Sequence, residues 1–141
     1  MKYLGLDLGS RTLGVAISDT TKTIATKYSV IRHNEEYDRL LDDVYNIVKA
    51  ENIEKIVLGF PKNMDNSIGF KGQLSIEFQK KLEEYINIPV VLQDERLTTK
   101  EAESVLIKNN TSRKKRKKVI DSLAATIILQ EYLDKEKNNN E

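Results

Sequence analysis

Short apolar segments open the chain, and polar or glycine-containing pairs separate them. Gly9-Ser10 and Asp19-Thr20 divide three runs that are rich in β-branched and aromatic residues. Runs of this length between turn residues are typical of β-strands joined by short connections. The pattern therefore predicts an antiparallel meander formed by KYLGLDLG, TLGVAISD and TIATKYSVIRH.

The hydrophobic period then becomes helical. From Tyr37 to Glu51, apolar residues recur at intervals of three and four, which predicts an amphipathic helix. The next run, EKIVLGFP, is almost continuously apolar and suits a strand buried on both faces of a sheet. The polar loop KNMDNSIGFKGQ precedes a second predicted helix. The apolar spacing of that helix is kept by Leu74, Phe78, Leu82 and Tyr85.

A last strand and two helices complete the predicted elements. IPVVLQDE is typical of another central strand. Thr98, with Glu101 three residues later, offers a capping box for a helix that reaches about Lys108. The helical period returns in VIDSLAATIILQEYL. The apolar face of this final helix comprises Ala124, Ala125, Ile128 and Tyr132.

The order of these elements is β-β-β-α-β-α-β-α-α. It indicates an α/β fold with a five-stranded mixed sheet, in which the first three strands are antiparallel and helices cover the faces. We expect a single domain over residues 1–135. Residues 136–141 are low in apolar side chains, so we expect a frayed tail there.

Length and composition narrow the class of protein. A chain of 141 residues can bury about two thirds of its unfolded surface. Cysteine is absent, which excludes disulfides and thiolate metal sites and suits a reducing cytoplasm. No apolar run approaches the roughly 18–20 residues that span a bilayer. We therefore expect a cytoplasmic protein without a membrane partner.

The net charge of +1 hides an uneven distribution, because six consecutive cations precede the last helix. These are Arg113, Lys114, Lys115, Arg116, Lys117 and Lys118. A run of this kind is often a solvated, mobile loop. The alternative is a contact for phosphate backbones, where each neutralised phosphate releases counterions.

Three carboxylates stand at positions where the pattern calls for other residues. Asp7 interrupts the first strand, where an unpaired ionised aspartate would be expensive. Glu95 directly follows a buried strand, at the edge where open α/β sheets bind ligands. Asp121 shares the apolar face of the final helix.

Each of the three has a structural alternative. Asp7 could cap the turn that follows it, and Glu95 could pair with Arg96. Asp121 could lie in the first turn of its helix, where the macrodipole favours a negative charge. Their joint occurrence favours a shared site, since the first strand, the last strand and the last helix of such a fold can converge.

Converging carboxylates without cysteine or clustered histidine favour a hard divalent cation, Mg²⁺ or Mn²⁺. Two such ions about 4 Å apart can stabilise the attacking and leaving oxygens of a phosphodiester displacement. The basic run immediately before Asp121 favours a polyanionic substrate. Together these features indicate metal-assisted hydrolysis of a nucleic acid strand.

Four ordered motifs resemble those of a known family. The motifs are LGLDLGSRTLGVAISD, IVLGFPKNMDN, QDERLTT and KKVIDSLAATIIL. In this order, and in a chain of this length, they resemble the RuvX family, also called YqgF, over nearly the whole domain. The resemblance implies a ribonuclease H-like fold with five strands, the first three antiparallel, and helices on both faces.

The resemblance also implies an activity. Family members are regarded as bacterial cytoplasmic nucleases that mature the 5′ end of the small-subunit ribosomal RNA precursor. Relatives described as Holliday junction resolvases keep structured DNA open as a substrate beside the favoured RNA. Matched by motif, Asp7, Glu95 and Asp121 would be the catalytic residues and the ligands of Mg²⁺ or Mn²⁺.

Polar side chains near these motifs are candidates for phosphate contacts. They are Arg11, Lys62, Asn63, Arg96 and the basic run Arg113–Lys118. Arg11 could instead be a solvated turn residue, and Arg96 could pair with Glu95. His33 ends the third strand, far in sequence from every acidic motif, and we interpret it as a surface residue.

Other functions stay open. The first motif also resembles the phosphate-binding hairpin of the actin and sugar-kinase superfamily, but 141 residues leave no room for the second domain of those enzymes. A nucleic-acid-binding module of the same fold could carry the same motifs without catalysis. A Holliday junction resolvase would act as a symmetric dimer, whereas a precursor RNA nuclease could act as a monomer. The sequence is therefore compatible with either a monomer or a homodimer.

Overall fold

The computed structural model describes the backbone of residues 1–9, 11–60, 69–94 and 113–139. Within the helices, the side chains of residues 70–71, 113–122 and 138–139 fall outside this description. The predicted helix over residues 98–108 also lies outside the described residues.

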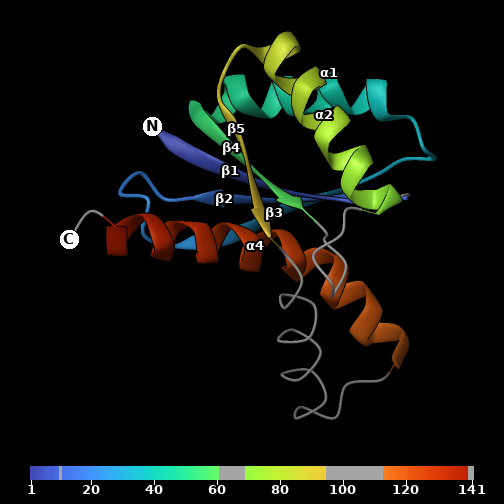
Figure 1. Ribbon diagram of the computed structural model, residues 1–141. Helices are drawn as coiled ribbons and strands as arrows, with labels where there is room; N and C mark the ends of the chain where they lie inside the picture. Colours follow the sequence, from blue (N-terminus) through green and yellow to red (C-terminus); the bar gives the residue numbers. More distant parts are fainter. Residues whose placement is uncertain (10, 61–68, 95–112, 140–141) are drawn as a thin grey trace.

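Five strands form one mixed sheet in the order β3-β2-β1-β4-β5 (Figure 1). The strands are β1 (Lys2–Leu8), β2 (Thr12–Ser18), β3 (Ala25–Arg32), β4 (Ile53–Phe60) and β5 (Val90–Asp94). The first three pair antiparallel, whereas β4 runs parallel to β1 and β5 runs parallel to β4. The predicted meander and the parallel second half of the sheet are confirmed.

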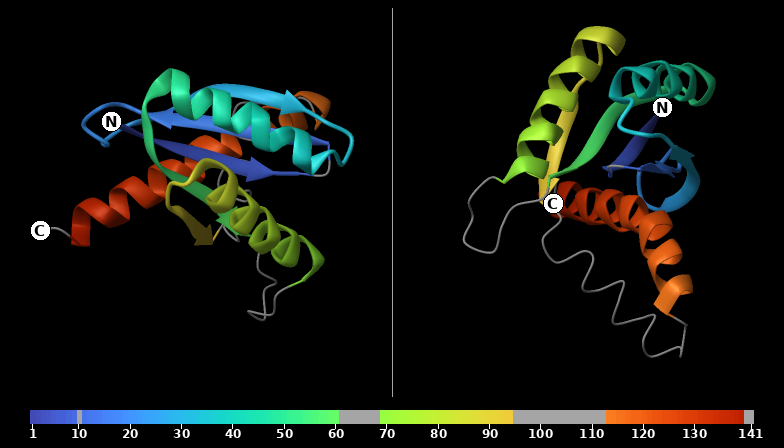
Figure 2. Two further views of the ribbon diagram at one scale, coloured as in Figure 1. Left: turned by 90° about the horizontal axis from the view of Figure 1, so that it is seen from above. Right: turned by 90° about the vertical axis from the view of Figure 1, so that its right-hand side faces the viewer.

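Helices cover both faces of the sheet (Figure 2). They are α1 (Tyr37–Glu51), α2 (Phe70–Ile86) and α4 (Arg113–Asn139). Helices α1 and α2 pack on one face, and α4 packs on the other. No helix in the described part of the chain is long and apolar enough to cross a bilayer.

The face under α1 and α2 holds the larger hydrophobic core. Its fully buried members include Leu4, Leu6, Leu40, Val44 and Leu82. Burial of a side chain of this size contributes about 1.5–3 kcal/mol. The predicted spacing of α2 is wrong at one position, because Tyr85 is 49% exposed and Ile86 is buried instead. The hydroxyl of Tyr85 reaches Asp42 on α1, which holds its ring at the surface.

The face under α4 carries smaller side chains, so the helix approaches the sheet closely. A Cβ atom at Gly5 would lie 2.7 Å from the Cβ of Leu129 and 3.0 Å from the carbonyl oxygen of Ala125. Only glycine fits this position of β1 without displacing α4. Ala16 on β2 and Ala125 on α4 are fully buried in the same layer.

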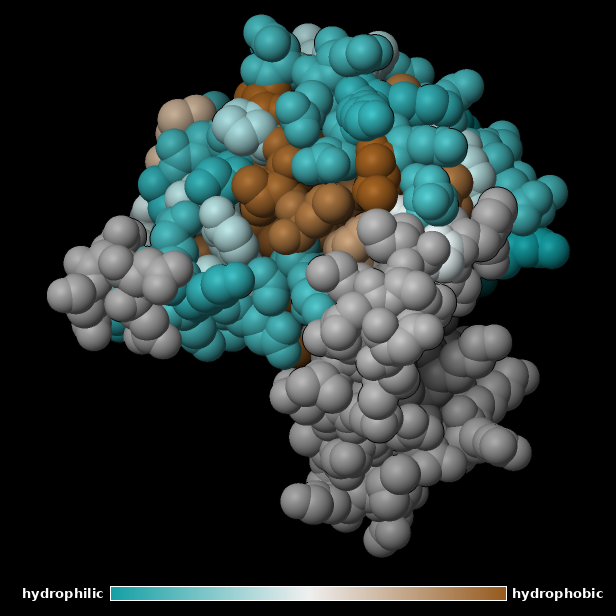
Figure 3. Space-filling model, viewed as in Figure 1, coloured by the Kyte–Doolittle hydropathy of each residue, from teal (hydrophilic) through white to brown (hydrophobic). Residues whose placement is uncertain are grey.

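Strand β5 differs from the central strand that we predicted. It pairs with β4 alone and lies at the edge of the described sheet. Its first residue, Val90, is buried, and the other four residues are half-buried. Hydrophobic surface gathers around this edge in Figure 3. The apolar run that resembled a central strand is explained by the contacts that β5 makes with α2 and α4.

Helix α4 begins earlier than predicted. Its backbone is helical from Arg113, so the basic run Arg113–Lys118 forms the first turns of the helix and the predicted loop is wrong. The run contains no apolar residue, and it therefore leaves no hydrophobic period to reveal a helix. Lysine and arginine are nevertheless good helix formers, which permits this backbone.

The carboxyl end of α4 also extends beyond the prediction. The helix continues to Asn139, so residues 136–139 are helical where we expected a frayed tail. Glu136 explains the extension, because its carboxylate contacts Tyr3 on β1 and Lys55 on β4.

Candidate functional site

Asp7 lies near the carboxyl end of β1, paired with Gly14 of β2, and is half-buried. Successive side chains of a strand point to opposite faces. Leu6 and Leu8 pack into the core under α1 and α2, whereas Tyr3 and Gly5 contact α4. Asp7 has the same parity as Tyr3 and Gly5 and therefore faces α4.

The parallel strands bring their carboxyl ends to the edge of the sheet that carries Asp7. In the register of the sheet, Leu6 is level with Leu58, which is level with Leu92. Strand β5 ends two residues later at Asp94, opposite Phe60. Glu95 is the next residue in the chain and lies outside the described residues, so its place in the site stays a prediction.

Asp121 belongs to α4, more than two turns after the helix begins at Arg113. The first-turn alternative for this aspartate is therefore wrong, and the helix macrodipole does not account for it. One turn later, Ala125 is fully buried, as the predicted apolar face requires. The side chain of Asp121 lies outside the described residues.

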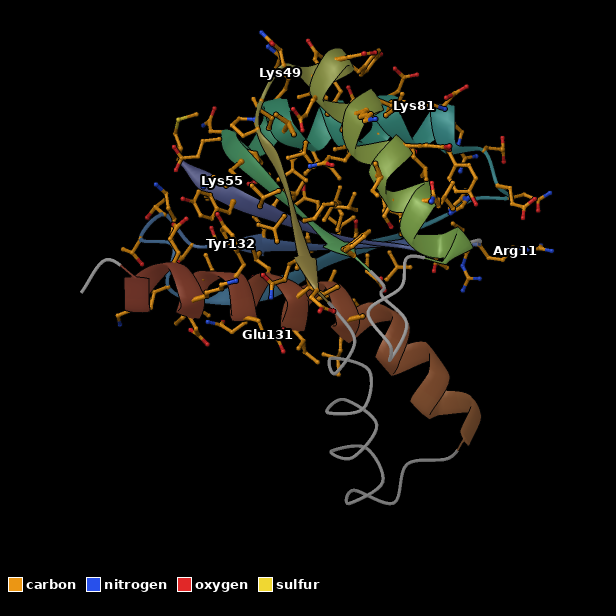
Figure 4. The ribbon with its side chains drawn as sticks, in the orientation of Figure 1. Arg11, Lys49, Lys55, Lys81, Glu131 and Tyr132 are labelled. Atoms are coloured by element: carbon orange, nitrogen blue, oxygen red, sulfur yellow. The ribbon has the colours of Figure 1, made fainter. Side chains whose placement is uncertain are left out.

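Of the predicted phosphate contacts, the structure describes the side chain of Arg11. It is exposed on the connection between β1 and β2, at the rim of the molecule (Figure 4). The remaining candidates lie outside the described residues or have undescribed side chains, and their roles stay predictions. They are Lys62, Asn63, Arg96 and the side chains of Arg113–Lys118.

His33 is not the surface residue that we predicted. It is 7% exposed, and its Nε2 lies 2.9 Å from the carbonyl oxygen of Gly9. The backbone N–H of Glu35 donates to its Nδ1 at 3.0 Å. The prediction failed because Gly9 is distant from His33 in sequence. Gly9 follows β1, which pairs with β2, and β2 in turn pairs with β3, the strand that His33 follows. The pairing of Thr12 with Arg32 brings the end of β3 to this connection.

A polar cluster that the sequence did not reveal lies at the opposite end of β1. Its members, which we call the clasp, are Tyr3, Lys55, Tyr132 and Glu136. The Tyr3 hydroxyl donates to Glu136 at 2.8 Å, and the Lys55 ammonium donates to the Tyr132 hydroxyl at 3.0 Å. Lys55 also pairs with Glu136 at 3.4 Å. Figure 4 shows Lys55 and Tyr132 at the other end of the sheet from Arg11.

The clasp satisfies its own charges. Burial acts to raise the pKa of Glu136, but hydrogen bonds from Tyr3 and Tyr132 and the charge of Lys55 outweigh it and lower that pKa below its ordinary value. The Lys55 ammonium lies 5.0 Å from the centroid of the Tyr3 ring and 5.4 Å from that of Tyr132. These contacts tie β1 and β4 to the last turns of α4.

The predicted metal centre includes residues whose side chains the structure does not describe. Among the described side chains, no three acidic or histidine residues gather closely enough to hold a metal ion. Two of the three predicted ligands, Glu95 and Asp121, are not part of that set. Of the three predicted ligands, only Asp7 has a described side chain.

The chain matches known proteins along nearly its whole length. The family model described as "RuvX: Holliday junction resolvase" matches residues 1–135. A protein of Caldanaerobacter subterraneus subsp. tengcongensis, named "Putative pre-16S rRNA nuclease", is 53% identical over 140 residues, covering 99% of this chain and 100% of that protein. A Bacillus subtilis protein of the same name is 53% identical over 135 residues, covering 95% of this chain and 98% of the other.

Two solved structures share the fold at low sequence identity. RuvC of Thermus thermophilus, in complex with a Holliday junction substrate, matches with a TM-score of 0.62 at 16% identity, covering 98% of this chain and 96% of that one. The fowlpox virus Holliday junction resolvase matches with a TM-score of 0.56 at 15% identity, covering 96% of this chain and 99% of that one. The chain therefore has the ribonuclease H-like fold that the sequence motifs implied.

Proposed function

The chain belongs to the RuvX family, and from this membership we propose that it is a metal-dependent nuclease that hydrolyses phosphodiester bonds of ribosomal RNA precursors in the cytoplasm. The observation that carries the proposal is the position of Asp7, half-buried at the end of β1 and facing α4. Proteins of this architecture bind ligands at this edge of the sheet, and Asp7 places a carboxylate there.

The packing of β1 against α4 supports a shared site for Asp7 and Asp121. Two residues before Asp7, Gly5 abuts the carbonyl of Ala125. Two residues along a strand span about 6.6 Å, and four residues back along a helix span about 6 Å. Because the chain directions of β1 and α4 are opposed, this step leads from Ala125 toward the turn that holds Asp121.

Three carboxylates form a ligand set that suits Mg²⁺ or Mn²⁺, which prefer oxygen donors. Asp7, Glu95 and Asp121 would hold the metal, and when bound it supplies the Lewis acid that polarises the scissile phosphate and activates water. The carboxylates are also the catalytic residues in this proposal, since they fix the position at which water displaces one ester oxygen.

Cationic side chains around the site would hold the nucleic acid strand. Arg11 is exposed on the connection that follows Asp7. The basic run Arg113–Lys118 makes up the first turns of α4, so six consecutive cationic residues belong to the amino end of this helix. Cations repel one another there and oppose the helix macrodipole. Phosphate groups would relieve both effects, which supports this end of α4 as a backbone contact together with Lys62, Asn63 and Arg96.

RNA is the favoured substrate because relatives that match end to end carry the name of a pre-16S rRNA nuclease. The second candidate is a Holliday junction, which the description of the family model names. A junction resolvase would need two symmetric sites and therefore a homodimer, whereas the RNA nuclease could act as a monomer.

A substrate panel tests the proposal. The purified protein is given RNA with the 5′ leader of the small-subunit precursor, unstructured RNA, duplex DNA and a four-way DNA junction, each with Mg²⁺, Mn²⁺ or EDTA. We expect the leader RNA to be cleaved fastest, with cleavage abolished by EDTA. Paired cuts in the junction and none in RNA would favour the second candidate. No cleavage of any substrate with either metal would contradict both.

A further inference from the structure

His33 is the one histidine of the chain, and both of its ring nitrogens are engaged. The backbone N–H of Glu35 donates to Nδ1 at 3.0 Å, so Nδ1 acts as an acceptor and carries no proton. The proton of the neutral ring must then be on Nε2, which donates to the carbonyl of Gly9 at 2.9 Å. The surrounding backbone therefore selects a single tautomer.

These contacts join His33 to both sides of the connection between β1 and β2. Its ring holds the carbonyl of Gly9, and its backbone N–H donates to the carbonyl of Arg11 at 3.0 Å. The N–H of Gly9 donates to the carbonyl of Thr12 at 2.8 Å and closes the connection. Gly9 follows Asp7 by two residues, so this network holds the segment directly after the end of β1.

The ring of His33 is itself held from the side of α1. Glu35 has a left-handed backbone with φ of 60°, a conformation that a non-glycine residue adopts at a cost. Its N–H bond to His33 helps to maintain that conformation. Tyr37, the first residue of α1, packs its ring at a centroid distance of 5.4 Å from the imidazole. His33 thus connects the start of α1 to the segment that follows Asp7.

We propose that His33 is a positioning residue for the nuclease reaction: through Gly9 and Arg11 it fixes the end of β1, so that Asp7 and Arg11 keep one geometry toward metal and phosphate. The inference rests on the proposed function. A displacement of about 1 Å in a reacting group can cost roughly 100-fold in rate, so a hydrogen bond that fixes this segment matters to the reaction.

Two substitutions separate positioning from simple structural support. Asn in place of His33 can accept the N–H of Glu35 but is too short to reach Gly9. Gln in place of His33 can place its amide nitrogen near the position of Nε2 and donate to the Gly9 carbonyl. The two variants lose the same ring and the same contact with Tyr37. They differ in which of the two hydrogen bonds they retain.

The test measures kcat and KM on the cleaved RNA, the Kd for Mn²⁺ by calorimetry, and the metal-free Tm of each variant. We expect His33→Asn to lower kcat by about 10- to 100-fold and to weaken Mn²⁺ binding, as loss of a group that orients a metal ligand does. We expect His33→Gln to stay near wild type in both, with metal-free Tm values that are alike in the two variants.

The inference is overturned if His33→Asn keeps the wild-type kcat and Mn²⁺ affinity, or if both variants lose kcat in parallel with Tm. The imidazole ¹⁵N spectrum adds a readout that does not depend on activity, because the single histidine gives the only imidazole signals. A proton on Nδ1 in the native protein would also overturn the inference. If wild type neither cleaves nor binds Mn²⁺, the proposed function fails and the inference with it. If the wild type cleaves RNA and His33→Asn is unaffected, the inference is rejected while the proposed function stands.

Discussion

The contact between β1 and α4 has two ends with opposite chemistry. At the amino end of β1, the clasp pairs the carboxylate of Glu136 with the ammonium of Lys55 and with the hydroxyl of Tyr3. At the carboxyl end, β1 carries Asp7 on the same face, and α4 carries Asp121 on the turn before Ala125. One end pairs opposite charges within the protein, and the other is the end at which we expect the acidic residues to gather.

The difference teaches how one packed pair of elements can both stabilise a fold and perform a reaction. A charge removed from water needs a partner. The clasp provides one internally and so contributes to the free energy of unfolding. In our proposal, Asp7, Glu95 and Asp121 at the other end hold Mg²⁺ or Mn²⁺, and their role is in the reaction. Mutations at the two ends should therefore act on different quantities.

Asp7→Asn should give the largest effect on the reaction. We expect RNA cleavage to fall by more than about 100-fold, since even loss of a group that only supports a metal ligand costs about 10- to 100-fold. The fold should be retained, as measured by circular dichroism. Asp38→Asn is the matched control, because this exposed carboxylate lies on α1, on the opposite face of the sheet. Cleavage by Asp7→Asn at the control rate would remove the distinction between the two ends.

Gly5→Ala should disturb both ends at once, because Gly5 lies between them. The added Cβ would stand 2.7 Å from the Cβ of Leu129 and force α4 away from β1. We expect the free energy of unfolding to fall by ~2 kcal/mol, as for other overpacked cores. Denaturant titration and RNA cleavage measure the two consequences.

Gly9→Ala gives a graded comparison for that change. Its new Cβ would lie 3.2 Å from the carbonyl oxygen of Thr12, a milder contact within the connection between β1 and β2. The loss of stability should therefore be smaller than for Gly5→Ala. Equal stability of Gly5→Ala and wild type would show that α4 can shift without cost.

Glu136→Gln should lower stability while leaving the reaction intact. It removes the charge that faces Lys55 and weakens the acceptor of the Tyr3 hydroxyl, for a loss of ~1 kcal/mol in a partly exposed pair. Glu83→Gln, an exposed change on α2, is the control and should be neutral. A parallel loss of Mn²⁺ affinity in Glu136→Gln would contradict the separation of the two ends.

The smallest expected effect is the pH dependence of that loss. The pKa of Glu136 in the folded protein lies below its ordinary value of 4.5, so the ionised clasp stabilises the fold above this pH. The contribution is lost as pH falls through the lowered pKa. The stability difference between wild type and Glu136→Gln should therefore shrink on acidification below 4.5. A difference that grows in this range would show that the neutral acid is the form that the clasp favours.

Much of the fold could be predicted because its signals are local. The helix predicted from Tyr37 to Glu51 has those bounds in the structure, since its apolar period lies within one segment. Burial of His33 could not be predicted, because its partner Gly9 becomes a neighbour only when the strands pair. The close approach at Gly5 likewise depends on Leu129, which is distant in sequence.

The candidate site was accessible to sequence reasoning for another reason. Asp7 and Asp121 conflict with the hydrophobic pattern around them, and such a conflict can be recognised without knowledge of the fold. The structure places Asp7 on the face of β1 that α4 covers and rejects the first-turn alternative for Asp121. The side-chain positions of Glu95 and Asp121 stay predictions, as does the metal that they would share.

The hydrogen bond between Tyr3 and Glu136 spans 133 residues and so sets a condition on biosynthesis. The start of β1 leaves the ribosome long before the last turns of α4 are translated. Until then, β1 has no helix against the face that carries Asp7. Contacts at this separation close late and slowly. A nascent chain in which α4 has not yet been translated would lack Asp121 and, in our proposal, could not assemble the acidic site.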